Sequence, residues 1–336
     1  GCQNHKEGIQ KILEIFDQEK NYPGSADLIV HRVVHGGTKY RHAALLDLEV
    51  KQFIRDMIPL ARTHHPASLA CIEEISEHFP EIPQAVVFDT SFHQTLPEYA
   101  WRYALPRKIS DQYAIRRYGF HGISHQSVVK QAASFLKTPV NKLNLITIHL
   151  GNGASISAIK KGICVDTTMG MTPLEGLVMG TRPGDLDPGI LTLLASKGWN
   201  QEALETMLNQ DSGMKGLCGT NDFREILQNK EEGNEEAEMA LELYCYRVRK
   251  TIGSFSTVIG PVDALVFTGG VGENVPRVRE RSVRGMEWMN IQLDPDMNDF
   301  AEAPCAIHSK DSQTKILVLP SDEEWEMASQ AAELIL

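Results

Sequence analysis

The sequence predicts an α/β protein with mixed sheets, and three observations point to that class. Short β-branched runs alternate with longer segments whose apolar residues recur at helical spacing. Glycine turns separate three of the short runs between residues 143 and 169, as in antiparallel hairpins. The chain has 336 residues, 42% of them hydrophobic and 23% charged, which suffices for two globular domains.

The first part of the chain is expected to form helices around two short strands. Apolar residues at helical spacing predict a helix over 6–20, and DLIVHRVVHGG (27–37) reads as a strand leaving into a Gly-Gly turn. Helices are expected over 48–62 and 66–79, the second opened by Pro66 in the first turn. QAVVFDT is a buried strand ending on Asp89. A further helix is expected over 126–136.

Residues 143–169 have a different rhythm. The runs NLITIHL, ASISAIK and ICVDTTM are separated by GNG and KKG. The loop His149–Gly153 is therefore expected to turn back into a second strand. This excludes a dinucleotide-binding fingerprint at that point, because that motif needs a strand followed by a helix.

A long Gly/Pro-rich loop covers 170–188 in the second half of the chain. Helices are expected over about 189–196, 201–209 and 234–258, with the acidic KEEGNEEAE as the solvated start of the last one. The strands DALVFTGG and KILVLP and a closing helix, DEEWEMASQAAELIL, complete the pattern.

Composition excludes several classes of protein. A formal net charge of −11 argues against a nucleic-acid surface, which needs clustered Lys and Arg. No apolar stretch approaches the roughly 20 residues of a membrane span. The six cysteines show neither zinc-site spacing nor a disulfide framework. We expect a cytoplasmic protein whose cysteines are reduced and mostly sit as small core residues.

Four polar loops follow predicted strands: HRVVHGG, FDTSFH, HLGNG and FTGGVGEN. In α/β folds ligands gather at the carboxyl ends of strands, so these loops are expected to converge. Glycines between a strand and a helix in FTGGVGEN would let the backbone approach phosphate, although a plain tight turn fits these residues equally well. The presence of a second glycine loop, HLGNG, about a hundred residues earlier in the sequence favours a phosphate site.

Eight ordered motifs between residues 31 and 325 resemble those of the acetate kinase family. They are HRVVHGG (31–37), FDTSFHQTLP (88–97), RRYGFHGISH (116–125), HLGNGASI (149–156), DTTMGMTPLEGLVMGTRPGDLDP (166–188), NDFR (221–224), FTGGVGEN (267–274) and SDEEW (321–325). The resemblance implies two ribonuclease-H-like domains with mixed sheets and an interdomain ATP cleft, as in actin, sugar kinases and heat-shock chaperones. The N-terminal domain would comprise 1–91 and 325–336, and the C-terminal nucleotide-binding domain 92–324.

The resemblance implies a homodimeric enzyme that transfers phosphoryl from ATP reversibly to acetate with Mg²⁺, giving acetyl phosphate and ADP. Propionate or butyrate kinase activity is an alternative within the same wider group. A non-catalytic ATP-binding module of the actin type is an alternative from another class. A sugar kinase would need polar side chains where this chain has MTPLEGLVMG.

Residue roles follow from the motifs by resemblance. The implied catalytic residues are Asp89, His121 and Arg182, and the implied substrate-binding residues are Arg32, Val34, Phe120 and Pro173. Arginine suits a carboxylate or a moving phosphoryl group because it is always charged and makes planar bidentate contacts. The structural alternatives are a buried salt bridge for Arg32, an exposed side chain for Arg182 and a packed histidine for His121.

The family describes the residue matching Asp89 as a catalytic acid or base. A carboxylic acid substrate with a pKa of about 4–5 is already ionised at neutral pH, so no base is needed to activate it. We therefore expect Asp89 to orient Arg32 or a Mg²⁺-bound water. The alternative is a strand-end aspartate that caps a turn.

Nucleotide and metal contacts are also implied by resemblance. The ATP-binding residues would be His149, Leu150, Gly151, Asn152, Gly153, Asp222, Phe223, Arg224, Gly270, Val271, Gly272, Glu273 and Asn274. Asp222 could equally be a helix N-cap. Glu323 would bind Mg²⁺, or serve only as a first-turn acid behind a capping box of Ser321 and Glu324.

The chain departs from the family pattern at two places. Thr63 stands beside His64, a family-site histidine, where a leucine is usual, which leaves the preferred acid open; His65 next to it could be solvent-exposed. Nothing in residues 1–30 resembles the Asn-x-Gly-Ser-Ser-Ser phosphate loop that opens family members. Either the sequence is part of a longer chain, or this version of the fold lacks that loop.

Overall fold

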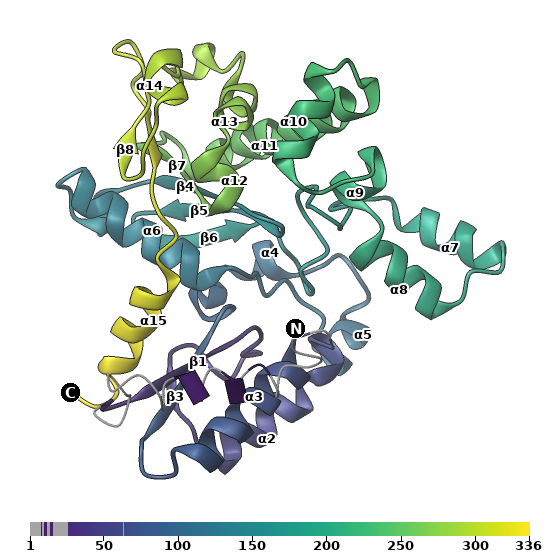
Figure 1. Cartoon of the computed structure of the whole chain (residues 1–336), viewed down its shortest axis with the longest axis vertical. Helices are drawn as coiled ribbons and strands as arrows, with labels where there is room; N and C mark the ends of the chain where they lie inside the picture. Colours follow the sequence, from purple (N-terminus) through teal and green to yellow (C-terminus); the bar gives the residue numbers. More distant parts are fainter. Residues whose placement is uncertain (1–7, 9, 12–13, 16–25, 63) are drawn as a thin grey trace. The chain divides into compact units, whose positions relative to one another are not determined.

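Two units make up the chain in the computed structural model, which describes residues 8, 10–11, 14–15, 26–62 and 64–336 (Figure 1). One unit comprises Gly1–Gln94 and Glu323–Leu336, and the other Thr95–Asp322. The sequence placed these changeovers at 91/92 and 324/325. The predicted helix over 6–20 lies largely outside the described residues, and Thr63 lies outside them altogether.

The first unit carries a three-stranded sheet in the order β1-β3-β2. Its elements are β1 (Ile29–Val33), β2 (Ala44–Leu45), α2 (Leu48–Asp56), η2 (Ile58–Leu60), α3 (His65–His78), β3 (Gln84–Phe88) and α15 (Glu323–Ala332). β1 and β3 are parallel, and β2 is antiparallel to β3. Val33, Ile54, Ile72 and Phe88 form part of the core beneath the sheet. Parallel pairing therefore brings the loops after β1 and β3 to one edge.

The predicted helix over 48–62 is shorter than expected. α2 ends at Asp56, and a single 3-10 turn, Ile58–Leu60, follows. Pro59 has no backbone N–H and its ring would clash with the carbonyl four residues earlier, so an α-helix cannot run through it. α3 begins at His65 with Pro66 in its first turn, as the sequence predicts.

The second unit is built on a six-stranded mixed sheet in the order β6-β5-β4-β7-β9-β8. The strands are β4 (Leu145–Leu150), β5 (Ala154–Lys160), β6 (Ile163–Thr167), β7 (Ala264–Thr268), β8 (Cys305–Ala306) and β9 (Lys315–Val318). β4, β5 and β6 form the antiparallel hairpins that the glycine turns predict. β7 runs parallel to both β4 and β9.

Helices surround this sheet (Figure 1). They are α4 (Glu98–Trp101), α5 (Arg107–Gln112), α6 (Gly122–Phe135), α7 (Pro188–Ser196), α8 (Gln201–Gln210), α9 (Gly213–Cys218), α10 (Phe223–Glu231), α11 (Glu235–Ile259), α12 (Gly269–Asn274), α13 (Pro276–Val283) and α14 (Pro295–Asp299), with 3-10 turns η3 (Ser91–Thr95), η4 (Val140–Lys142) and η5 (Glu287–Met289). α6 packs on β4 and α11 on β5. α7 and α8 form a hairpin that extends away from the sheet (Figure 1).

The segment GGVGEN is itself helical, which differs from the expected glycine loop before a helix. The Glu273 carboxylate accepts a hydrogen bond from the backbone N–H of Gly269 at 2.9 Å and so caps the first turn of α12. Pro276 then opens α13 directly behind it. The side-chain cap offsets the weak helix propensity of three glycines, a compensation that propensity alone does not predict.

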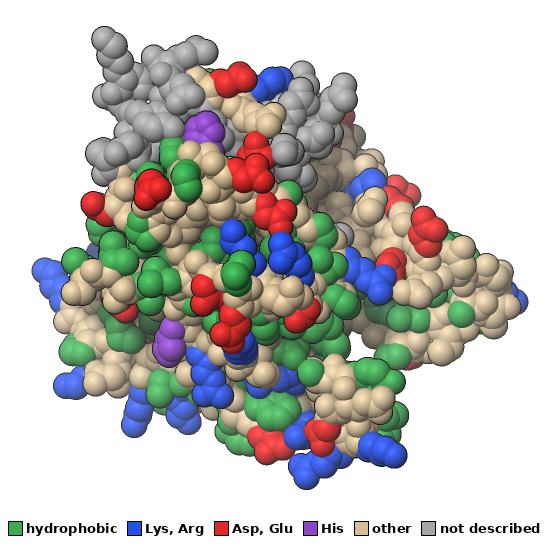
Figure 2. Space-filling view, turned by 90° about the horizontal axis from the view of Figure 1, so that it is seen from below, with side chains coloured by type: hydrophobic (Ala, Val, Ile, Leu, Met, Phe, Trp, Pro, Cys, Tyr) green, Lys and Arg blue, Asp and Glu red, His purple; other side chains and the backbone are tan. Residues whose placement is uncertain are grey.

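Surface and composition agree with a charged, mixed exterior. On the face drawn in Figure 2, Lys and Arg side chains are spread among Asp and Glu side chains of the described residues. No helix in the described part of the chain has the length and apolar character needed to cross a membrane. The five cysteines described are free thiols, and Cys164 and Cys245 are buried while the other three are half-buried.

Candidate active site

The first unit pairs Arg32 with Asp89 across the two parallel strands. Arg32 Nε donates to Asp89 Oδ1 at 3.1 Å and Nη2 donates to Oδ2 at 2.6 Å. The Asp89 side chain is 2% exposed and that of Arg32 is 43% exposed. Asp89 follows β3 immediately, and its N–H donates to the Val33 carbonyl, which fixes it beside the end of β1. The two side chains thus form an ion pair in which the carboxylate is buried and the Arg32 guanidinium is partly exposed to solvent.

Electrostatics couple this pair to Glu323, the first residue of α15. Arg32 Nη1 lies 3.8 Å from Glu323 Oε2. The Asp89 carboxylate raises the pKa of Arg32. Burial raises the pKa of the Asp89 carboxyl, while Arg32 and then His64 oppose that shift. Burial also raises the pKa of Glu323, again opposed by Arg32.

Beside the Arg32–Asp89 pair, the described residues of this unit offer the Glu323 carboxylate as a candidate ligand for a metal ion. Among the described residues no group of three or more His, Cys, Asp or Glu side chains could hold a metal. Both Asp89 oxygens already accept hydrogen bonds from Arg32. The Glu323 carboxylate lies beside that pair, and its contact with Arg32 at 3.8 Å is longer than a hydrogen bond. One oxygen ligand fits Mg²⁺, which keeps most of its waters and binds substrate phosphates, and does not fit a structural zinc site.

The loop after β1 shows why its glycines are needed. Gly36 N–H donates to Thr90 Oγ1 at 2.9 Å, which ties the loop after β1 to the loop after β3. A Cβ atom at Gly36 would come within 2.9 Å of the Phe88 ring. Val34 lies half-buried at the start of this loop. Two of the four polar loops predicted to converge therefore meet in this unit.

The other two loops meet in the second unit, at the carboxyl ends of the parallel strands β4 and β7. His149 pairs in register with Thr268. A Cβ at Gly269 would lie 2.7 Å from the carbonyl oxygen of Leu150, the buried last residue of β4. The backbone of Gly269 has a φ of +76°, which favours glycine. Close approach of the two loops thus depends on this glycine.

The turn Gly151–Gly153 is held from two sides. Gly151 N–H donates to the Gly153 carbonyl at 2.9 Å within the turn. The carbonyl of Asn152 accepts from Gly180 N–H at 2.9 Å, and its side-chain oxygen accepts from Asn221 Nδ2 at 2.8 Å. The motif NDFR (221–224) is therefore joined to the glycine hairpin, the other segment of this region expected to contact ATP.

Arg182 and His121 converge on Gly153. A Cβ atom built on Gly153 would lie 2.9 Å from Arg182 Nη2 and 3.1 Å from His121 Nε2. Arg182 Nη1 donates to the Pro173 carbonyl at 2.7 Å. Burial lowers the pKa of the half-buried Arg182, and no carboxylate in the described part of the chain forms an ion pair with it. An anion would meet this positive charge at the hairpin turn.

His121 sits in an uncommon backbone conformation at the N-cap of α6. Its φ of +55° is left-handed, and few residues other than glycine adopt that region. Phe120 before it is 2% exposed and anchors the turn in the core. His121 Nδ1 lies 2.9 Å from Ser155 Oγ, and its ring stacks on His149 with centroids 4.3 Å apart. Backbone strain of this kind is found most often at functional sites, where it holds a side chain in one orientation.

The residues expected on the nucleoside side, Asp222, Phe223 and Arg224, lie at the start of α10. Asp222 is the N-cap, accepting from Arg224 N–H at 2.9 Å, as the structural alternative predicts. The Arg224 guanidinium also binds this carboxylate and lowers the pKa of Asp222 to about 2. The Arg224 side chain is 91% exposed. Phe223 is buried and packs edge-to-face on Tyr244, so its side chain belongs to the core.

α12 is fixed by Glu273, one of the residues expected to bind ATP, and by Arg279, which the sequence did not single out. Glu273 caps the helix and accepts from Ser321 N–H at 3.3 Å. Arg279 is fully buried; its Nη1 donates to the carbonyls of Gly272 and Glu273, and its Nε and Nη2 donate to Asn298. The remaining predicted residues Gly270, Val271 and Asn274 lie on this helix, where Asn274 Nδ2 donates to the Gly270 carbonyl at 2.9 Å.

A second unpredicted network holds the loop that carries Pro173. Arg117 Nη1 donates to the carbonyls of Thr167 and Thr168 at 2.9 and 2.8 Å, and Nη2 binds Glu175 at 2.7 Å. The Tyr103 hydroxyl binds the other Glu175 oxygen. Spacing gave no signal for these contacts, because they join segments 50 to 72 residues apart.

Comparison with known proteins gives a consistent result along the whole chain. The acetokinase family profile matches residues 1–329. The acetate kinase of Sulfurovum sp. is 48% identical over 99% of this chain and 85% of its own length. The crystal structure of Porphyromonas gingivalis acetate kinase superposes with a TM-score of 0.93 at 40% identity, over 99% of this chain and 85% of that one.

A propionate kinase is almost equally similar in structure. The crystal structure of the enzyme from Francisella tularensis has a TM-score of 0.92 at 40% identity, over 97% of this chain and 83% of that one. These similarities, with the mixed sheets of both units, confirm the two-domain actin-like fold class that the motifs imply.

Proposed function

The chain belongs to the acetokinase family, and from this premise we propose that it transfers the γ-phosphoryl group of ATP reversibly to acetate, giving acetyl phosphate and ADP. Phosphoryl transfer needs little covalent help from a protein. It needs positioning and neutralisation of the charge that spreads over three equatorial oxygens. The described side chains are well suited to both tasks.

Arg182 is the observation that carries this proposal. Its guanidinium is half-buried, has no ion-pair partner among the described residues and lies beside His121 Nε2 at the glycine turn. Holding an uncompensated charge in such a place is costly unless an anion joins it. A non-catalytic ATP-binding module would gain nothing from that cost. We therefore assign Arg182 and His121 to the moving phosphoryl group.

Arg32 is proposed to bind the acetate carboxylate. Asp89 uses the Nε and Nη2 donors along one edge of the guanidinium. Nη1 makes no hydrogen bond to Asp89 and lies 3.8 Å from Glu323 Oε2, and the Arg32 side chain is 43% exposed. We propose that the substrate carboxylate binds to this Nη1 donor. Asp89 holds the plane of the guanidinium and takes no proton from a substrate that is already ionised. Val34 in the first unit, and Phe120 and Pro173 in the second, are the residues proposed to contact the methyl group of acetate.

ATP is proposed to bind at the two glycine segments of the second unit. Backbone N–H groups of residues 151–153 would face its phosphates, and Asp222, Arg224 and α12 would hold its nucleoside. Mg²⁺ is the proposed metal with Glu323 as its protein ligand, and when bound it would neutralise part of the phosphate charge.

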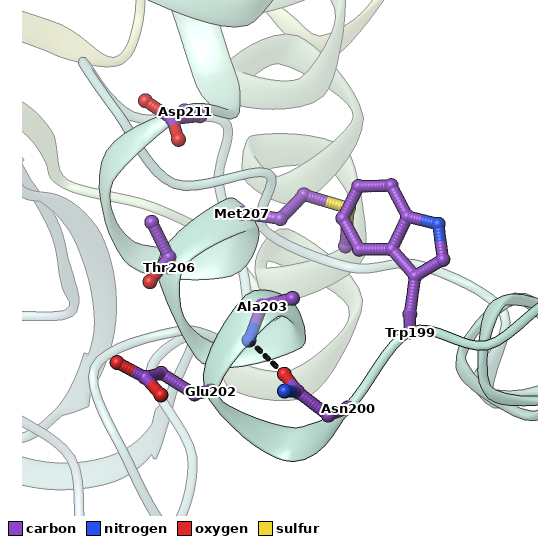
Figure 3. A pocket seen from close by; sticks show the side chains of 7 residues that line it. All are labelled: Trp199, Asn200, Glu202, Ala203, Thr206, Met207 and Asp211. Atoms are coloured by element: carbon purple, nitrogen blue, oxygen red, sulfur yellow. Dashed lines mark hydrogen bonds between the residues drawn. The ribbon is translucent and has the colours of Figure 1, made fainter.

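A homodimer is also proposed, with α7 in its interface. The helix contains Ile190, Leu191, Leu193 and Leu194, yet buries none of its residues. Leu191 and Leu208 border an apolar hollow of about 550 Å³. A second hollow, lined by Trp199 and Met207 among others, lies on α8 (Figure 3). A helix that exposes several large apolar side chains beside an apolar hollow is typical of a protein–protein interface. The free thiols favour a reducing compartment, for which we propose the cytoplasm.

The proposed activity is tested by trapping the product. The purified protein is incubated with Mg-ATP and acetate, propionate or butyrate in turn, and acyl phosphate is captured with hydroxylamine. Product that depends on both Mg²⁺ and acid supports the proposal, and the ranking of the three acids identifies the substrate. ATP binding by calorimetry without any trapped product would instead favour the non-catalytic binding module.

A further inference from the structure

We propose that Ser155, His125 and Thr147 form a hydrogen-bond relay that fixes the tautomer of His121, so that its neutral ring donates a hydrogen from Nε2. The inference rests on the proposed function, because it assigns positioning residues to the same phosphoryl-transfer site. His121 would contact the phosphoryl group, and the other three side chains act through it.

The fold places these side chains together behind the site. His121 and His125 are four residues apart at the start of α6, and residues at that spacing share a helix face. α6 packs on β4, which carries Thr147. The antiparallel register pairs Thr147 with Ser157 and His149 with Ser155. Thr147, Ser155 and His125 are all fully buried, so the relay is closed to solvent.

Short contacts join the relay in one line. Thr147 Oγ1 lies 2.8 Å from His125 Nδ1. His125 Nε2 lies 2.8 Å from Ser155 Oγ. Ser155 Oγ lies 2.9 Å from His121 Nδ1. Each distance is in the range of a good hydrogen bond. His121 Nε2, the far end of the line, faces Gly153 and Arg182.

Counting hydrogens gives the relay a direction. A hydroxyl group has one hydrogen, so Ser155 can donate to only one of its two imidazole neighbours and must accept from at least one of them. The direction of the line is then set at its buried end, by Thr147. The Thr147 hydroxyl could donate its hydrogen either to His125 Nδ1 at 2.8 Å or to the Ser157 carbonyl at 3.5 Å. The longer contact is too weak to compete for this hydrogen.

Thr147 therefore donates to His125 Nδ1, whose ring then carries its hydrogen on Nε2. His125 Nε2–H donates to Ser155, and Ser155 donates to His121 Nδ1. A neutral imidazole whose Nδ1 accepts must carry its hydrogen on Nε2. Bonds aligned in one direction polarise one another, which strengthens this arrangement over its reverse.

The relay has a clear chemical use at this site. Arg182 already brings a positive charge beside Gly153, and the His149 ring stacks on that of His121. A second cation at His121 would repel Arg182. A neutral ring that still presents an N–H donor adds a hydrogen bond to a phosphoryl oxygen without that repulsion, and its position costs no rearrangement during transfer.

The tautomer is read directly by NMR on protein labelled with ¹⁵N-histidine, with the His121 signals assigned by their loss in His121→Asn. We expect Nε2–H in the wild type. Ser155→Ala removes the donor to Nδ1 and is expected to give a mixture of both tautomers. Ser157→Ala is the matched control, since it deletes a buried hydroxyl two residues along the same strand that bonds Thr167 and contacts neither ring.

Kinetics give a second readout. Ser155→Ala is expected to lower kcat by about 10- to 100-fold with the KM values for ATP and acetate changed less than about twofold, because only the orientation of the donor is lost. The isosteric Thr147→Val should lower kcat less, and Ser157→Ala should leave kcat unchanged. A fall that appeared equally in Ser157→Ala would indicate general loosening and overturn the relay.

The two hypotheses fail in different ways. If the wild type yields no acyl phosphate, the proposed function fails, while the NMR measurement still tests the relay. If the wild type is active but His121 carries its hydrogen on Nδ1, or if Ser155→Ala changes neither tautomer nor kcat, the relay is wrong and the proposed function stands.

Discussion

The guanidinium of Arg32 donates two parallel hydrogen bonds to the carboxylate of Asp89, one to each oxygen, at 3.1 and 2.6 Å. This geometry holds the plane of the guanidinium and engages both carboxylate oxygens. A carboxylate so engaged orients its partner and is poorly placed to accept a proton from substrate. The distinction between orienting group and general base can be tested.

Asp89→Asn is expected to lower kcat/KM for acetate by about 100- to 1,000-fold, because it removes the charge that holds a partly buried Arg32. The loss should be the same at every pH between 6 and 8, since acetate is ionised throughout. The measurement is the pH profile of kcat/KM for both proteins. If Asp89 were a general base, kcat/KM of the wild type would fall on the acidic side of the profile as Asp89 became protonated, and this fall would be missing in the variant.

Arg182→Ala is expected to lower kcat by about 1,000-fold with only a modest change in the KM for ATP. A guanidinium that neutralises charge in the transition state contributes little to ground-state binding. Arg182→Lys keeps the charge but loses the planar fork, and should recover part of the activity. An unchanged kcat in steady-state assays would remove Arg182 from the transition state.

Acid is expected to destabilise the first unit through His35. Burial lowers the pKa of His35 from 6.5 to about 3. Below pH 6.5 the unfolded chain binds a proton that the folded chain does not bind until about pH 3, so the stabilisation present above pH 6.5 is lost across that window. The loss approaches about 1.4 kcal/mol per pH unit.

Urea unfolding at several pH values measures this effect. His35→Asn keeps an acceptor for the Gly37 N–H that His35 Nδ1 now accepts, and should flatten the pH dependence. The exposed His42→Asn is the control. Equal slopes in wild type and His35→Asn would contradict the assignment.

Arg279→Met is expected to lower the free energy of unfolding by about 3 kcal/mol and to weaken ATP binding. The substitution leaves the buried carbonyls of Gly272 and Glu273 without their donor at the end of α12. Thermal unfolding and calorimetry with ATP measure the two effects. Arg277→Met removes an exposed arginine from α13, the helix that carries Arg279, and should change neither. Stability loss without weaker ATP binding would separate α12 from the nucleotide site.

Leu193→Glu is expected to convert the proposed dimer into a monomer. The Leu193 side chain lies on the unburied apolar helix α7 and is 56% exposed, so the substitution costs the monomer little. An ionised carboxylate is costly to bury at an interface. Sedimentation velocity checks the result, with the exposed Gln201→Glu on α8 as control. A wild-type monomer would refute the dimer outright.

Local pattern predicted much of this fold. Apolar periodicity located most of the helices, and the turns GNG and KKG predicted the hairpins of β4, β5 and β6, because strand alternation and turn chemistry act over a few residues. The helical state of GGVGEN was not predicted, since a glutamate four residues from Gly269 outweighs the propensity of its glycines. The family motifs predicted the candidate site residues, but they did not predict the residues that hold them in place, such as Arg117 and Arg279.

A signal for the relay was present in the sequence. Polar residues recur at alternate positions in two strands otherwise rich in apolar residues, Thr147 and His149 in one, Ser155 and Ser157 in the other. Alternation places each pair on one face of a sheet, and polar side chains on a buried face need partners. The sequence does not say which helix supplies those partners.

The sequence by itself determined the order of strands and helices, the acidic balance and the family, because each is carried by local spacing or by motifs read in order. Only the tertiary structure decided between the two roles expected for Asp89, by placing its carboxylate on Arg32 57 residues away. It alone also decided that Arg182 lies beside His121 with no ion-pair partner among the described residues, and that one serine joins two histidines. Such pairings are set by strand register and helix packing, which fix side-chain distances between segments whose separation along the chain carries no information about them.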